Sequence, residues 1–282
     1  ASVFEDLPPA DGLWVYRIAA VNSAGTLSEL TNAGQATSDG TAPKAVSISY
    51  TSQGKTDPAT GRMGQGVVSV VLKTNEALQM TPYLSVVPEG GAPIPVELTR
   101  SSDTEYRGTF LISSNTPSGV ANALFSARDM VGNRGTDIDA GASIKVDTEG
   151  PVLSSIVLNP VAPIKNDTAQ TLQVTFTLSK KPSSVPQFKF LLSGPVRSPV
   201  TLSSVSQVNP TTYSASFSLP SDAGLGTPES LSFSHISKDD LDNLSNKVSA
   251  LNRFQVYQGN LPPLDVPYGF TAKAQAQGKV RL

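Results

Sequence analysis

The sequence contains no cysteine and only one histidine, His235, among its 282 residues. The lack of cysteine excludes disulfides, thiolate catalysis and cysteine-based zinc sites. A single histidine cannot form a histidine metal cluster, and no Gly-x-Ser-x-Gly nucleophile motif accompanies it. Because His235 lies in a stretch of alternating apolar residues, we expect a structural side chain rather than a catalytic one. The sequence therefore favours a non-enzymatic protein without a cofactor.

Charged residues are also scarce, at 16% of the chain, and the net charge is −2. This balance provides no basic surface for nucleic acid. No run of 18 apolar residues is present, so we expect no insertion into a membrane. The chain begins at Ala1 with neither a signal sequence nor an initiator methionine. We therefore expect a segment processed or excised from a longer protein.

Apolar residues alternate with polar ones along many short segments of the chain. Residues 67–76 and 171–180 have this two-residue period, as do residues 106–112 and 213–219. No window has the period of an amphipathic helix, and turn-forming residues recur roughly every ten positions. The pattern predicts an all-β protein built from β-sandwiches.

A short polar turn recurs three times, each time after an alternating strand. Its copies are residues 22–26, 129–133 and 239–243, which read NSAGT, DMVGN and DDLDN. The copies are spaced by roughly 110 residues, close to the length of one β-sandwich. The third copy has Asp242 where the second has Gly132. Asp tolerates a left-handed backbone better than most residues, so the turn is expected to survive the change.

Proline marks the junctions at the same period. Pro43, Pro151 and Pro262 each follow one of the turns and precede a further apolar segment. Proline fixes φ and removes a backbone donor, so it stiffens a linker. The two markers together predict a tandem array of modules.

The turn at residues 129–133 and the Asp-Thr-x-x-Pro linker at residues 147–151 resemble those of bacterial Ig-like domains in large surface and secreted proteins. The stretch of residues 13–25 resembles the penultimate strand and final hairpin of a fibronectin type III domain. Residues 263–282 resemble the first two strands of another. The resemblance implies tandem Ig-like and fibronectin III-like sandwiches, arranged end to end. It leaves open whether the strand order is that of an immunoglobulin or of a fibronectin module.

Four segments follow from this reading. Residues 1–42 would be the C-terminal strands of one fibronectin III-like module, and residues 260–282 the N-terminal strands of another. Residues 43–149 and 150–259 would be complete Ig-like sandwiches. The two part-modules are expected to result from truncation. The alternative is that they complement each other as strands of one sheet.

Two local patterns could carry chemistry. Residues 61–66, GRMGQG, are glycine-rich, but a strand rather than a helix follows them, so we expect a loop and not a phosphate site. Acidic residues near the junctions could contribute oxygen ligands to calcium, although turn capping by Asp is the simpler interpretation. The candidate calcium ligands are Asp147, Glu149, Asp239, Asp240 and Asp242.

Large aromatic residues at alternating positions are expected in the sandwich cores. They are Trp14, Tyr16, Phe125, Phe176, Phe217 and Phe233. The expected function is that of non-catalytic structural or adhesive spacer modules in a large extracellular or cell-surface bacterial protein. The alternative is a set of accessory binding or docking modules of a large secreted enzyme or toxin. Expected partners are neighbouring modules of the same chain and a protein or glycan ligand.

Overall fold

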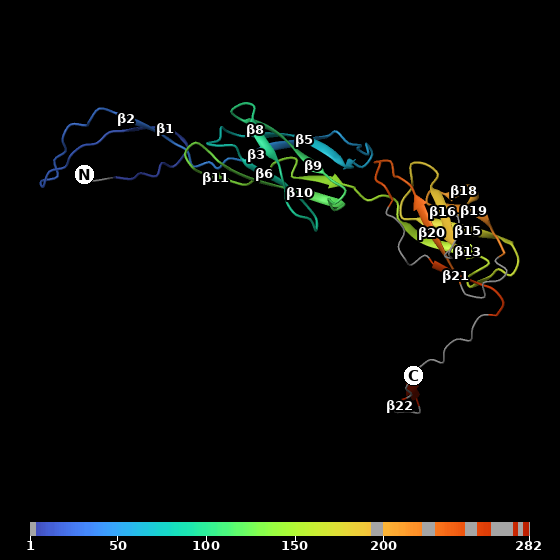
Figure 1. Cartoon of the computed structure of the whole chain (residues 1–282). Coiled ribbons are helices and arrows are strands. Elements are labelled where there is room, and N and C mark those ends of the chain that lie inside the picture. Colours follow the sequence, from blue (N-terminus) through green and yellow to red (C-terminus); the bar gives the residue numbers. More distant parts are fainter. Residues whose placement is uncertain are drawn as a thin grey trace. The chain divides into compact units, whose positions relative to one another are not determined.

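The computed structural model describes residues 4–192, 200–221, 229–245, 253–260, 273–275 and 279–281. Within these residues every regular element is a β-strand, which confirms the all-β prediction (Figure 1). The chain forms two compact units. The first consists of Ala1–Gly150 together with Lys238–Leu244, and the second of Pro151–Ser237 together with Ser245–Leu282. The division into four modules remains a prediction, and residues 261–272, 276–278 and 282 of its last module lie outside the described residues.

The first unit begins with a hairpin of two antiparallel strands, β1 (Gly12–Tyr16) and β2 (Gly34–Ser38). Leu13 and Val15 on one face of β1 are 64% and 56% exposed. Trp14 and Tyr16 on the other face are half-buried. The prediction that these two aromatics are core residues is therefore wrong. Two strands alone cannot enclose a core, which explains the difference.

A two-sheet sandwich follows in the same unit. Alternation in β5 places Val68, Val70 and Leu72 in the core and exposes or half-exposes the residues between them. The order in one sheet is β3 (Ala45–Ser52), β5 (Gly66–Thr74), β9 (Glu105–Ile112), β8 (Glu97–Arg100). The order in the other is β4 (Arg62–Met63), β12 (Ser143–Val146), β10 (Gly119–Arg128), β6 (Tyr83–Pro88), β7 (Ile94–Pro95), with β11 (Arg134–Gly135) also pairing with β10.

The glycine-rich segment 61–66 is more ordered than the predicted loop. Arg62 and Met63 form the short strand β4, which pairs in parallel with Lys145 and Val146 of β12. Gly66 already belongs to β5. A two-residue parallel pairing depends on a strand more than 80 positions away, so local sequence does not signal it.

The second unit repeats this strand order. Its first sheet is β13 (Leu153–Asn159), β15 (Gln170–Leu178), β19 (Thr212–Leu219), β18 (Ser203–Asn209). Its second sheet is β14 (Ile164–Lys165), β21 (Arg253–Tyr257), β20 (Glu229–Ile236), β16 (Gln187–Leu192), β17 (Val200–Thr201). A separate pair joins β22 (Lys273–Gln275) and β23 (Lys279–Arg281). In both units a two-residue strand pairs in parallel with the last strand of the sandwich.

Aromatic residues fill the core of the second unit. The Phe176 ring stacks on Phe188 with centroids 3.8 Å apart, and it meets Phe233 edge-on at 5.9 Å. Phe217 is also buried, as is Phe125 in the first unit. These four predicted core aromatics, Phe125, Phe176, Phe217 and Phe233, are confirmed.

Candidate functional site

The recurring turns have one shared geometry. In the 129–133 turn, Asp129 Oδ1 accepts hydrogen bonds from the backbone N–H groups of Val131, Gly132 and Asn133 at 2.6–2.9 Å. In the 239–243 turn, Asp239 Oδ1 accepts them from Leu241 and Asn243, both at 2.9 Å. A short side chain that satisfies the N–H groups of its own turn is the physical reason for Asp at this position.

The fourth residue of each turn adopts a left-handed backbone. Its φ is +79° at Gly25, +104° at Gly132 and +65° at Asp242. Asp242 is the one non-glycine residue with positive φ among the described residues. The structure thus confirms that the turn survives replacement of glycine by aspartate.

The last residue of two turns binds the linker that precedes its module. Asn133 Nδ2 donates to the backbone oxygen of Asp39 at 2.9 Å, and Asn243 Nδ2 donates to that of Asp147 at 2.8 Å. Asp39 and Asp147 are equivalent, because each stands four residues before the linker proline. Each asparagine also donates to the aspartate that begins its own turn. The same side-chain amide therefore orders the turn and holds the linker.

Three carboxylates gather at the first of these linkers. Oxygen atoms of Asp39, Glu76 and Asp129 lie within 4.8 Å of one another. Burial raises the pKa of Glu76, and the negative charges of Asp39, Asp129 and Asp11 raise it further against the amide of Asn75. Burial opposes ionisation of Asp129, but donors from its own turn, led by the Asn133 side chain, outweigh it and lower its pKa. This set could hold a divalent cation, for which calcium would need further oxygens.

The second linker has a different charge arrangement. Asp147 Oδ2 accepts a hydrogen bond from Arg62 Nη1 at 2.7 Å. Asp57 also binds Arg62, and its pKa is lowered to about 2 by the Thr60 hydroxyl, the Ala59 N–H and Arg62. Lys180 in the second unit occupies the position that Glu76 occupies in the first. The neighbouring residues show this, since Asn75 caps the N–H of Lys44 as Ser179 caps that of Val152.

The five predicted calcium ligands occupy different environments. Asp147 pairs with Arg62, and Asp242 pairs with Lys55 at 3.0 Å. Asp239 is buried in its turn, while Asp240 and Glu149 are exposed. Asn243 Nδ2 links Asp147 and Asp239, so the structure brings these two together. Calcium at these five residues remains a prediction.

Sequence reasoning did not single out the set of Asp39, Glu76 and Asp129. The repeat contains part of the signal, because Asp39 and Asp129 are equivalent to Asp147 and Asp239, two of the predicted calcium ligands. The repeat gives no such signal for Glu76, because the equivalent residue in the second unit is the basic Lys180. The position of Glu76 beside the linker depends on the fold.

His235 lies in the core of the second unit, with 3% of its surface exposed. Its Nε2 is 3.3 Å from the backbone oxygen of Pro151, and its ring packs against Phe188 at 5.8 Å. Burial lowers its pKa, against the opposing effect of the Pro151 carbonyl. This placement agrees with the expected structural role.

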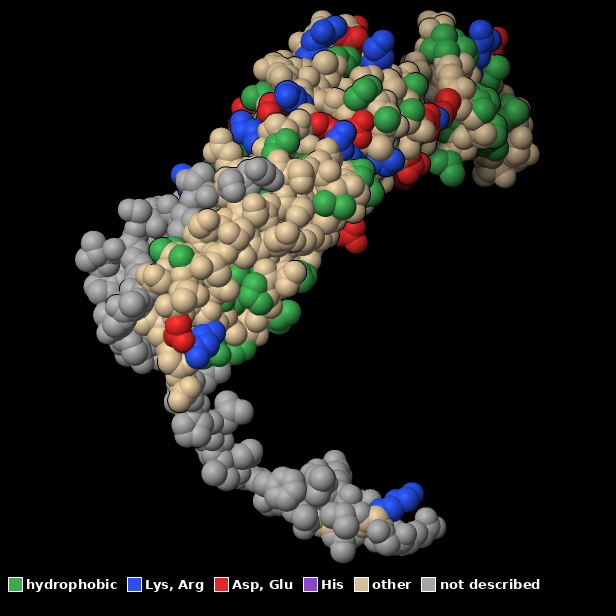
Figure 2. Space-filling view, turned by 90° about the vertical axis from the view of Figure 1, so that its right-hand side faces the viewer, with side chains coloured by type: hydrophobic (Ala, Val, Ile, Leu, Met, Phe, Trp, Pro, Cys, Tyr) green, Lys and Arg blue, Asp and Glu red, His purple; other side chains and the backbone are tan. Residues whose placement is uncertain are grey.

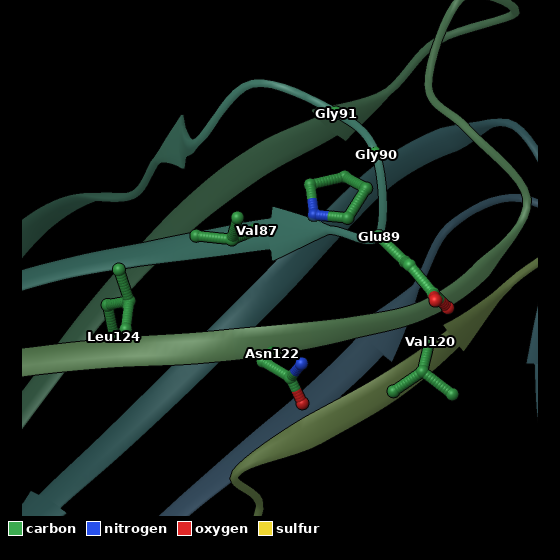
Figure 3. A pocket seen from close by; sticks show the side chains of 8 residues that line it. Val87, Glu89, Gly90, Gly91, Val120, Asn122 and Leu124 are labelled. Atoms are coloured by element: carbon green, nitrogen blue, oxygen red, sulfur yellow. The ribbon is translucent and has the colours of Figure 1, made fainter.

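A shallow groove of about 610 Å³ lies on the solvent face of β6 and β10 (Figure 3). Val87 of β6 is opposite Asn122 of β10, and Val120 and Leu124 extend the apolar lining. Glu89 is the one titratable residue that lines it, and its side chain extends toward Val120 in the close-up. A single carboxylate without a second acid or base provides a contact surface rather than a catalytic pair.

On the face shown in Figure 2, acidic and basic side chains are interspersed among polar residues and form no broad area of one sign. Among the described residues, the structure contains no helix long and apolar enough to cross a membrane.

Comparisons with known proteins give distant likenesses only. No protein-family model matches the sequence, and no curated protein matches it. One similar solved structure is a tetra-tandem repeat from the extending region of a large adhesion protein, with 17% identity and a TM-score of 0.31. The match covers 85% of this chain and 57% of that one, so the chain spans less than two thirds of it.

Two further solved structures are similar to the chain at the same low level. One belongs to a 1.5-MDa bacterial ice-binding adhesin, with 13% identity, a TM-score of 0.33, and coverage of 90% of this chain and 76% of that chain. The other is a chicken TCR, with 12% identity, a TM-score of 0.25, and coverage of 74% and 98%. Likeness at this level assigns no family and no activity.

Proposed function

We propose that the chain consists of non-catalytic structural modules of a large extracellular or cell-surface bacterial protein, and that they hold adhesive parts at a distance. The observation that carries this proposal is the repeated junction. Two sandwiches of the same strand order each follow a proline linker, and an asparagine of the next module binds that linker. Repetition of one unit with one type of connection is what an array of spacers requires.

The strand order also supports Ig-like modules. The sheet β3-β5-β9-β8 corresponds to strands A, B, E and D, and β12-β10-β6 corresponds to G, F and C. The resemblance of residues 13–25 to a fibronectin III-like hairpin is carried by sequence, and β1 with β2 forms a hairpin there. Extracellular location is proposed from the absence of cysteine and the polar, weakly charged composition.

A single-molecule experiment in which the chain is pulled between two handles tests whether the modules resist mechanical force, as a spacer must. About 100 residues at roughly 3.5 Å per residue extend to about 35 nm, so each sandwich should release slightly less than that in its own discrete event. Extension without two discrete events would overturn the proposal, because modules that yield without resistance cannot hold a fixed distance.

A second candidate, an accessory docking module of a secreted enzyme or toxin, is favoured by the groove on β6 and β10. Val120, Leu124 and the neighbouring Tyr83 are 42%, 53% and 54% exposed on that face. Apolar residues grouped beside Glu89 and Asn122 could form a binding surface. A glycan and protein binding panel decides between the two, with Leu124→Glu as the control variant: loss of a measured interaction in this variant would establish docking through the groove.

A further inference from the structure

The tips of the two Asp-x-x-x-Asn turns differ in burial although their backbones match. Leu241, the third residue of the 239–243 turn, is 6% exposed, while the equivalent Val131 is 60% exposed. Both turns have the same aspartate cap and the same left-handed fourth residue. The difference therefore arises from what packs against the tip and not from the turn itself.

The glycine-rich segment covers Leu241. A Cβ atom at Gly64 would lie 3.0 Å from the Leu241 backbone oxygen and 3.1 Å from its Cβ, closer than most side chains allow. The φ of Gly64 is not positive, so its backbone does not require glycine. The close approach of Leu241 is thus the physical reason for glycine at residue 64.

Polar contacts surround the contact between Gly64 and Leu241. Asn243 is completely buried, and its Oδ1 accepts a hydrogen bond from Gln65 Nε2 at 3.2 Å. Its Nδ2 donates to the backbone oxygen of Asp147, and Lys55 pairs with Asp242 at 3.0 Å. All polar atoms of the Asn243 amide are therefore satisfied, and two of its partners, Gln65 and Asp147, lie in the sequence before residue 150.

These contacts explain why Lys238–Leu244 belongs to the first unit although β20 and β21, on either side of it in the chain, belong to the second. We propose that Lys55, Gly64, Gln65 and Asp147 form a recognition surface for an Asp-x-Leu-x-Asn turn. Docking of the turn completes the first unit. This inference does not depend on an adhesive function.

The two aligned tips provide a matched pair of variants. Leu241→Ala removes buried methyl groups from the tip of the 239–243 turn. Val131→Ala removes exposed methyl groups from the tip of the 129–133 turn. Calorimetry of the full chain should show Leu241→Ala lowering the midpoint of the first unit by about 5 °C or more. Val131→Ala should leave that midpoint unchanged. Hydrogen exchange with mass spectrometry identifies which unit each transition belongs to.

The reciprocal variant keeps the turn sequence intact. Gln65→Ala leaves the buried Asn243 oxygen without its donor, so exchange of the amides in residues 239–243 should become about tenfold faster. Leu241→Ala should likewise speed exchange at Gly64 and Asp147. A Leu241→Ala effect confined to the second unit, or unchanged exchange of the turn in Gln65→Ala, would overturn the proposal. Failure of the pulling experiment would leave it untouched.

Discussion

Replacing Asn133 by aspartate tests whether the turn asparagine holds the linker. The two side chains have nearly the same shape, so Asn133→Asp creates no cavity. It replaces a donor to the Asp39 carbonyl at 2.9 Å and to Asp129 Oδ2 at 2.7 Å with an acceptor. Loss of one neutral and one charge-assisted hydrogen bond costs about 2–4 kcal/mol. Repulsion between the new carboxylate and Asp129 adds to this loss at neutral pH.

Urea denaturation of the full chain measures the effect. The expected result is a loss of about 2–4 kcal/mol in the unfolding free energy of the first unit, with the second unit unchanged. Asn133→Ala should cost less, because it adds no charge. The loss in Asn133→Asp should shrink as pH falls through the range in which carboxylates protonate. A change below about 0.5 kcal/mol in both variants, which is typical of an uninvolved surface position, would refute the reasoning.

Three further predictions concern single side chains. Burial lowers the pKa of His235, so the second unit should be fully stable above the ordinary histidine pKa of about 6.5 and lose stability as pH falls below it; thermal melting of His235→Phe should lack this loss. The raised pKa of Glu76 makes its charge unfavourable at neutral pH, so Glu76→Gln should melt higher than the parent at pH 7 but not below pH ~4. If the cluster of Asp39, Glu76 and Asp129 binds calcium, millimolar calcium should raise the melting temperature of the parent more than that of Glu76→Gln. Equal shifts of the two melting temperatures would argue against that site. Phe176→Ala should destabilise the second unit by about 3–5 kcal/mol and leave the first unchanged, so a shared loss in two-transition melting would contradict separate cores.

The sequence predicted the parts of the fold that depend on local pattern. Alternation located β5 and β15, and the turn repeat located the turns at residues 22–26, 129–133 and 239–243. Each of these signals is contained within about ten consecutive residues, so the sequence alone shows it. Sequence reasoning failed where burial depends on distant segments. Trp14 and Tyr16 alternate as core residues do, yet the two-stranded hairpin leaves them half-buried.

The candidate site shows the same limit. The repeat aligns Leu241 with Val131, and only the fold shows that the first is buried and the second exposed. Leu241 is buried because Gly64, far earlier in the chain, approaches it closely. Glu76 joins Asp39 and Asp129 because Asn75, the residue before it, accepts a hydrogen bond from the N–H of Lys44 just after the linker. Tertiary packing, which has no short-range signature, determines both.

Small-angle X-ray scattering of the full chain tests the spacer function most directly. A compact globule of 282 residues has a radius of gyration of about 19 Å, and an unfolded chain of that length about 59 Å. Modules that hold other parts at a distance should give a value clearly above 19 Å and well below 59 Å. A radius near 19 Å would mean that the modules fold back on one another, and it would contradict the account.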